Sequence, residues 1–204
     1  MYAAFYLLTI VGMVGAYDVL YYHIYKLRLY QHHDAIWENV THLVRALLFA
    51  VMLLTVLHVR ASGWWWFLYP VLLGFELVNT MIDVILEPRT RKNIGGLPPV
   101  EYVLHVFLSL MTGAALASII WATHDKINAP TSLHLETLQV GSMVLAGAYS
   151  SIVMAMGMFS FELYCFIKLL GERGAKPASP AVSVKPSLSL DRSPAPLPGA
   201  SKPS

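Results

Sequence analysis

The sequence predicts an all-α integral membrane protein, a bundle of about five transmembrane helices with its N-terminus outside and its C-terminus in the cytoplasm. Hydrophobic residues make up 56% of the 204 residues and charged residues only 13%. The mean hydropathy of +0.57 is higher than a soluble domain of this length needs for its core. In addition, five apolar runs reach the length of about 20 residues that a helix needs to cross a bilayer.

The five helices are expected at about 3–25, 43–59, 64–87, 100–122 and 138–168. No Lys or Arg precedes the first run, and no small-residue cleavage site follows it, so we interpret it as a retained helix and not a signal peptide. Three tryptophans at 64–66 suit an interfacial belt at the start of the third helix. The turn-forming GGLPP at 95–99 separates the third helix from the fourth. The last run is long enough to tilt or to project from the bilayer.

These helices form one transmembrane domain, residues 1–170, and the rest of the chain is of a different kind. The tail 171–204 is dominated by Pro, Ser and Ala with few large apolar residues. Such a segment cannot bury a core, so we expect a disordered cytoplasmic tail. The single cysteine, Cys165, excludes an intrachain disulfide and a cysteine-based metal site.

The orientation follows from the Lys and Arg residues near the helix ends. With the N-terminus outside, the outer side carries only Arg60 and Lys126, and positive residues concentrate on the inner side, as is typical of cytoplasmic loops. The localisation expected for such a chain is the plasma (inner) membrane. No basic stripe that would follow a phosphate backbone is present, so the bilayer and not nucleic acid is the expected partner. The inner residues are Lys26, Arg28, Arg45, Arg89, Arg91, Lys92, Lys168, Arg173, Lys176, Lys185, Arg192 and Lys202.

Most acidic groups and several histidines fall in the inner half of this predicted bundle. A charged side chain near the bilayer centre costs roughly 2.5 to 3.5 kcal/mol, so each needs a partner or water. Helical spacing places them on stripes: Glu76 and Asp83 share a face of the third helix, and Glu101 lies one turn before His105 on the fourth. If the second helix begins before the membrane, a second Glu-x-x-x-His pair, Glu38 and His42, lies on it.

This pattern predicts a metal site at the inner face. A carboxylate and an imidazole four residues apart on a helix lie one above the other, so both can reach one ion. Oxygen ligands mixed with imidazole suit non-haem iron or manganese. The donor set resembles that of the di-iron carboxylate bundles, in which two Glu residues join two Glu-x-x-His motifs; here the spacing is four residues instead of three. The expected ligands are Glu38, His42, Glu76, Asp83, Glu101 and His105.

Four further residues are expected to support the ligands from behind. Asp18 and His23 are about 140° apart on a straight α-helix, so we do not expect both to point at one centre. Arg45 would neutralise excess carboxylate charge or hold an anionic substrate, or else extend to lipid phosphates. Glu162 would join the cluster or act as a proton-relay carboxylate. The simpler interpretation of the Glu-His pairs is a salt bridge or a charge that favours a helix N-terminus.

Three functions compete at this point. The first is a metal-dependent membrane oxidoreductase of di-iron type that acts on a lipid-like substrate, with a membrane redox partner. The second is a haem b electron-transfer subunit with His42 and His105 as axial ligands. The third is a non-enzymatic transporter or scaffold with a buried polar cluster. No inverted repeat favours transport.

Overall fold

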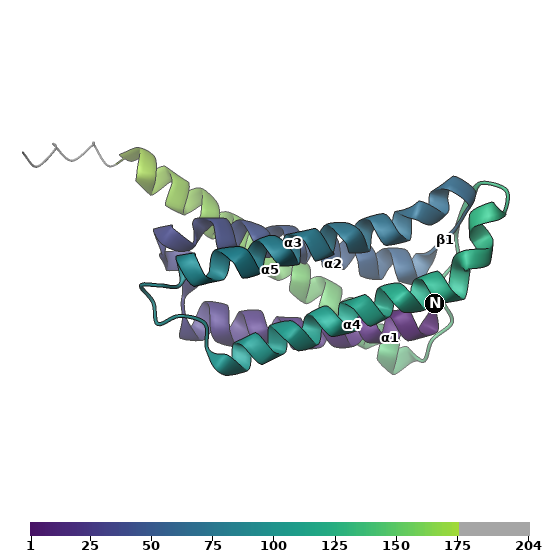
Figure 1. Ribbon diagram of the computed structural model, residues 1–204, viewed down its shortest axis with the longest axis horizontal. Coiled ribbons are helices and arrows are strands. Elements are labelled where there is room, and N and C mark those ends of the chain that lie inside the picture. Colours follow the sequence, from purple (N-terminus) through teal and green to yellow (C-terminus); the bar gives the residue numbers. More distant parts are fainter. Residues whose placement is uncertain (176–204) are drawn as a thin grey trace, which may run out of the picture.

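Five long helices dominate the computed structural model, which describes the backbone of residues 1–175. They are α1 (Tyr2–Asp18), α2 (Ile36–His58), α3 (Leu68–Thr90), α4 (Pro99–Thr123) and α5 (Ser142–Ala175) (Figure 1). A π-helical segment, η1 (Val19–Lys26), extends α1. Within residues 1–175, five helical segments are long and apolar enough to cross a membrane, as the sequence predicts. The predicted disorder of the tail concerns residues that lie almost entirely outside the described part.

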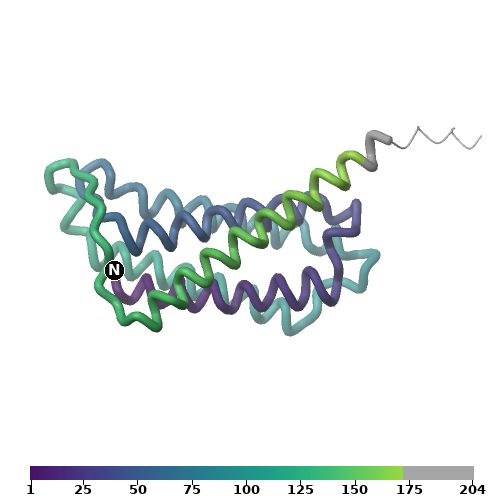
Figure 2. Tube along the Cα trace, turned by 180° about the vertical axis from the view of Figure 1, so that it is seen from behind, coloured from purple at the N-terminus to yellow at the C-terminus, as the bar shows by residue number. Residues whose placement is uncertain are grey.

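The helices form two pairs with α5 laid across them. α2 packs against α3, and α1 packs against α4, while α5 contacts both α1 and α2. Figure 1 shows the α2–α3 pair and the α1–α4 pair as two rows, and Figure 2, seen from behind, shows α5 running obliquely over both. Because α5 covers only one side of the two rows, the opposite side is bounded by α3 and α4 alone.

The two ends of the bundle differ in structure and charge. At one end, short 3-10 turns η2 (Leu29–Gln31) and η3 (His33–Ala35) connect α1 to α2, and residues 91–98 connect α3 to α4. We call this the basic end, because most of the described Lys and Arg residues gather near it, whereas Arg60 and Lys126 lie at the other end. The residues near the basic end include Lys26, Arg28, Arg89, Arg91, Lys92 and Lys168.

The other end, here called the sheet end, contains the N-terminus and two short antiparallel strands. β1 (Val59–Ser62) pairs with β2 (Ser132–Leu135), with Val59 opposite Leu135. The 3-10 turns η4 (Gly63–Phe67) and η5 (His124–Asn128) lie beside them. Gly63 has a φ of +57°, and a Cβ there would stand 2.7 Å from the Cα of Thr131, so only glycine fits. An all-α prediction did not include these strands.

The apolar core lies in the half of the bundle next to the sheet end. Large and small side chains alternate across the helices there, which allows close packing without voids. Its fully buried members include Ala4, Phe5, Leu8, Leu53, Leu57, Ala115, Ile119 and Ala148.

Three helices have boundaries that differ from those expected. α5 covers Ser142–Ala175 instead of 138–168, so residues 171–175, expected in the disordered tail, are helical. α2 begins at Ile36 and not at 43, because Glu38 and His42 are buried and continue the inner face of the helix. α3 begins at Leu68, after the tryptophans have formed η4, and continues past Pro88 to Thr90. A proline in the last turn removes only one N–H donor, so the helix tolerates it at this position.

Candidate metal centre

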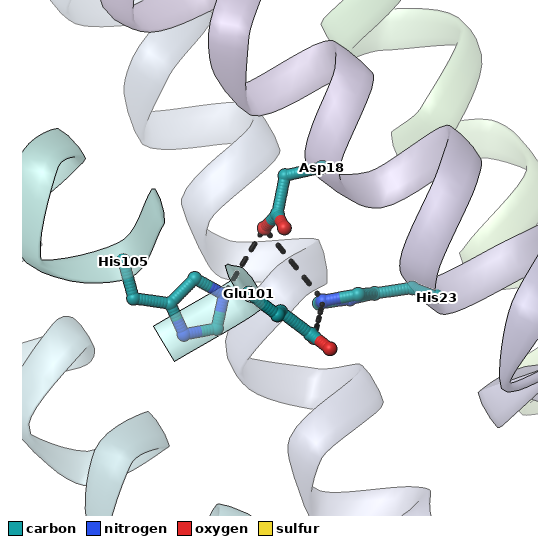
Figure 3. A group of neighbouring side chains, drawn as sticks. All are labelled: Asp18, His23, Glu101 and His105. Carbon is teal, nitrogen blue, oxygen red and sulfur yellow. Dashed lines mark hydrogen bonds and ion pairs between the residues drawn. The ribbon is translucent and has the colours of Figure 1, made fainter. Parts of the chain in front are cut away.

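Two histidines and two carboxylates converge near the basic end. Asp18, His23, Glu101 and His105 each offer one ligand atom, and these four atoms lie within 4.8 Å of one another. Figure 3 shows that Asp18 and His23 come from the α1–η1 segment and that Glu101 and His105 come from the start of α4. We refer to these four residues as the centre.

The π-helical segment η1 brings Asp18 and His23 together. In an α-helix these residues would diverge, but a π-helix bonds residue i to residue i+5, which places positions five apart on one side. His23 Nε2 is 3.7 Å from Asp18 Oδ2. The expectation that these residues cannot point at one centre is therefore wrong, because it assumed a straight α-helix. Single π turns inside helices occur frequently at functional sites.

The start of α4 supplies the other two side chains. Pro98 precedes the helix and Pro99 occupies its first position, where a missing N–H costs nothing. Glu101 therefore falls in the first turn, and His105 lies one turn later on the same face. The structure thus places this predicted Glu-x-x-x-His pair on one helix face.

The distances within the centre suit a single metal ion. His23 Nε2 is 2.9 Å from Glu101 Oε1, and His105 Nε2 is 3.0 Å from Asp18 Oδ2. Ligand atoms that lie about 2.0–2.2 Å from a tetrahedral metal are about 3.3–3.6 Å apart. These two pairs would have to widen by a few tenths of an ångström, and any pair near the 4.8 Å limit would have to approach by about 1 Å. Moreover, the second oxygens, Asp18 Oδ1 and Glu101 Oε2, are buried with no hydrogen-bond partner. Buried carboxylate oxygens of this kind need a cation or a proton.

Both imidazole rings of the centre are held in orientation by a contact to Nδ1. His105 Nδ1 faces Glu87 Oε1 at 3.0 Å, and His23 Nδ1 contacts His42 Nδ1 at 2.8 Å. The His23 and His42 rings are stacked with centroids 4.2 Å apart. Each ring of the centre therefore presents Nε2 to the carboxylates and Nδ1 to a partner, as metal-binding histidines usually do.

Glu38, one of the expected ligands, is held by a buried arginine. Arg91 is 0% exposed, and its Nε donates to Glu38 Oε1 at 2.7 Å. Arg91 also donates to Glu101, and the Thr90 hydroxyl donates to Glu38. Burial alone would lower the pKa of Arg91, but the carboxylates of Glu38 and Glu101 raise it, so the guanidinium remains charged.

Two more expected ligands are held by a second arginine. Arg45 donates from Nε to Glu76 Oε1 at 3.0 Å and from Nη1 to Asp83 Oδ2 at 2.9 Å. His42 Nε2 lies 3.5 Å from Asp83 Oδ1, and its Nδ1 lies 3.8 Å from Glu162. Of the six ligands expected from the sequence, the structure brings Glu101 and His105 into the centre; Glu38, His42, Glu76 and Asp83 surround it.

The whole region carries more acid than base. In the described part of the chain, seven buried carboxyl groups accompany two arginines, Arg45 and Arg91, and three histidines, His23, His42 and His105. Even with every imidazole protonated, the carboxyl groups outnumber the cations. The balance requires added positive charge, as protons or as a metal ion. The carboxyl groups belong to Asp18, Glu38, Glu76, Asp83, Glu87, Glu101 and Glu162.

Sequence reasoning underestimated two residues of the centre and one next to it. Asp18 is the one formally charged residue of the first apolar run, and a lone carboxyl in a membrane helix is by itself a functional signal. His23 could be found only by allowing a π-helix. Arg91 resembles an ordinary positive loop residue, and nothing in the sequence distinguishes it from Arg89 or Lys92.

No protein-family model, curated protein or solved structure matches this chain.

Proposed function

We propose that this chain is a multi-pass membrane protein that binds one transition-metal ion at Asp18, His23, Glu101 and His105. Two imidazoles with two carboxylates suit non-haem iron, with manganese as the alternative. The protein would use this ion in oxidoreductase chemistry on a lipid-like substrate at the inner face of the plasma membrane. The cluster of Lys and Arg residues at the basic end supports that orientation.

The observation that carries the proposal is the arrangement of both histidines. Each directs one ring nitrogen at a buried carboxylate and the other at a partner that fixes its orientation, Glu87 for His105 and His42 for His23. Structural salt bridges do not require this two-sided arrangement, whereas metal ligands generally have it. The buried oxygens Asp18 Oδ1 and Glu101 Oε2, which lack hydrogen-bond partners, add to the same argument.

The surrounding pairs favour one metal ion over two. A di-iron centre of the kind expected from the sequence needs further carboxylates, yet both oxygens of Glu38 are engaged, by Arg91 and Thr90, and both oxygens of Asp83 are engaged, by Arg45 and Thr41. Glu101 also accepts a hydrogen bond from Arg91, but only at Oε1, and its Oε2 has no hydrogen-bond partner. Glu76 has one such oxygen as well, but it pairs with Arg45 and does not belong to the four residues that converge. Releasing Glu38 would leave the buried Arg91 without one of its partners, at a cost of several kcal/mol. Iron held by two histidines and a carboxylate is typical of non-haem oxygenases. When bound, the metal would supply the redox chemistry, and the protein would hold and orient it.

Haem b fits this region less well. The two histidines considered as axial ligands are already engaged, since His42 stacks on His23 and His105 faces carboxylates from both nitrogens. The adjoining cavity has a volume of about 130 Å³. Pockets for drug-sized ligands begin at about 300 Å³, and a haem is no smaller than such ligands.

A second candidate function, proton or cation transfer through the membrane, is favoured by one observation. The contacts from Glu162 to His42, from His42 to His23 and from His23 to Glu101 form a continuous buried path. Chains of acidic groups and histidines serve as proton relays in membrane pumps. This candidate requires no metal ion, so metal analysis separates it from the first.

The deciding experiment is elemental analysis with an optical spectrum on the detergent-purified full chain. We expect close to one equivalent of iron or manganese in the wild type. The variants Asp18→Asn and His105→Gln should lose it, because each removes a ligand. Glu76→Gln and His58→Gln are the matched controls: Glu76 belongs to the neighbouring Arg45 pairs, and His58 lies at the sheet end, so both should retain the metal.

Other results would redirect the proposal. Two metal equivalents, both lost in Glu76→Gln, would restore the di-iron interpretation. A haem absorption band would establish the haem alternative. A metal-free protein in every preparation would overturn the metal centre and leave the relay.

A further inference from the structure

A cavity next to the centre joins it to the middle of the bundle. Its volume is about 130 Å³, and Asp18 and His105, two residues of the centre, contribute to its wall. The rest of the wall comes from all five long helices and has a polar side and an apolar side. The polar side includes His42, Arg45, Glu76, Asp83 and Glu162. The apolar side includes Gly12, Gly15, Phe49, Met52, Leu108 and Met158.

Exposed residues of the cavity wall indicate an opening on the side bounded by α3 and α4. Val84 on α3 and Ser109 on α4 both line the cavity, and both are exposed, as is Met154 on α5. α5 does not cover this side of the bundle (Figures 1 and 2). The neighbouring exposed residues are apolar, among them Met81, Ile85, Val106 and Leu110. A ligand that enters here would therefore come from the hydrocarbon region of a membrane and not from water.

Size limits what this cavity can hold. Apolar cavities of about 150 Å³ accept a molecule the size of benzene, so this one has room for a few carbon atoms of a chain. Two chains side by side do not fit. Gly15 is the residue that leaves the space, because a Cβ built there meets no atom within 4 Å.

Charge limits the head of the ligand. The one arginine on the cavity wall, Arg45, is already paired with Glu76 and Asp83, and carboxyl groups outnumber cations around it. Two arginines, three protonated histidines and one divalent metal ion would together just balance the seven buried carboxyl groups. An anionic head such as a carboxylate would therefore add negative charge that nothing in the described region compensates. A hydroxyl or amide head can instead hydrogen-bond to the carboxylates without that cost.

We propose that the cavity binds a single unbranched hydrocarbon chain with a neutral polar head, such as a long-chain alcohol. The chain enters between α3 and α4, its carbons lie against Gly12 and Gly15, and its head lies near Asp18 and His105. This inference deepens the proposed function. It rests on that function only where it takes the bound chain to be the substrate. Binding of the chain itself requires no metal.

The test is photolabelling of the full chain in lipid nanodiscs with a hexadecanol that carries a diazirine in its chain. We expect labelled peptides from α1 and α4. Gly15→Phe should reduce the labelling at least about tenfold, because filling the space excludes about two methylene groups of buried chain. Gly113→Phe is the matched control, since Gly113 has equally open surroundings but does not line the cavity.

A second variant guards against misfolding. Ala155→Leu fills the same cavity from α5 and should also reduce labelling. Unlabelled hexadecanol should compete, and hexadecanoate should compete about tenfold less well because its charge is not compensated. Equal labelling of wild type, Gly15→Phe and Ala155→Leu would overturn the binding site, and equal competition by hexadecanoate would overturn the neutral head.

Metal content measured in the same samples separates the two proposals. If Gly15→Phe reduces the labelling of a protein that contains no metal, the binding cavity is supported and the metal centre is rejected. If the protein retains its metal but Gly15→Phe and Ala155→Leu leave the labelling unchanged, the metal centre is supported and the binding cavity is rejected.

Discussion

The two halves of the bundle are built from the same helices, but different interactions hold these helices together in each half. Toward the sheet end, α1, α2 and α4 meet through fully buried apolar side chains such as Leu8, Leu57 and Ile119. Toward the basic end, the same helices meet through carboxylates, imidazoles and arginines, with Glu38, Arg91 and Glu101 all fully buried. Apolar packing, with strand pairing and hydrogen bonds but no cluster of buried ion pairs, holds the first half of the described bundle together. The buried charges of the second half are therefore not needed merely to join helices.

The contrast supports placing the proposed function near the basic end. Replacing a buried ion pair by apolar residues of similar volume is often neutral or stabilising, so stability alone gives no reason to bury this many charges. Ionisable groups inside a membrane protein are expensive and usually functional. In the proposed function, the half of the bundle near the sheet end is the scaffold half, and the half near the basic end is the chemical half.

The largest effect on stability is expected from Arg91→Met. The change leaves Glu38 and Glu101 buried without their cation, which should lower the free energy of unfolding by about 3 to 5 kcal/mol. Arg60→Met is the control from the sheet end, where the arginine donates to the carbonyls of Val56 and Val59. Denaturant titration in detergent measures both variants. If Arg91→Met lowered the free energy of unfolding no more than Arg60→Met, the two halves would not differ in the way described.

A smaller effect should follow from loosening one histidine without touching a ligand. Glu87→Gln keeps the shape of the side chain but weakens its hold on His105 Nδ1. We expect metal affinity to fall about 10- to 100-fold, the usual range for partners of metal-binding histidines. A competition titration with a chelator measures this affinity. The control is Glu136→Gln, which changes an exposed residue near the sheet end and should leave the metal affinity unchanged. If Glu136→Gln also lowered the metal affinity, the affinity would depend on overall charge and not on the contact between Glu87 and His105.

The scaffold half was the more predictable one. Apolar runs give the number of helices directly, since length and hydropathy are local properties of the sequence. The strands β1 and β2 escaped prediction because each has only four residues and their paired residues are 70 to 76 positions apart in the sequence. Trp66 was expected at an interface with its two neighbours, yet it is 5% exposed and Trp64 is 81% exposed. Local composition could not separate them.

The chemical half was predictable only in outline. Helical spacing correctly grouped Glu101 with His105, and the cost of buried charge correctly pointed to the basic end. Which carboxylates remain available depends on which arginines reach them, and that is a three-dimensional property: Arg91 is 53 residues from Glu38 in sequence. The π-helix η1 changes the direction in which the His23 side chain points relative to that of Asp18. Spacing rules for α-helices do not predict this direction.

The smallest expected effect comes from a single neutral hydrogen bond near the sheet end. Trp66 Nε1 donates to Thr123 Oγ1 at 2.8 Å, and Trp66→Phe removes that donor while keeping an aromatic ring. Stability should fall by about 1 kcal/mol, the usual net value of such a bond, and metal content should not change. Trp64→Phe, at an exposed position, is the control and should have almost no effect. Denaturant titration and elemental analysis of the same samples test both statements. Because the apolar core separates Trp66 from the centre, a loss of metal in Trp66→Phe would contradict the division of the bundle into scaffold and chemical halves.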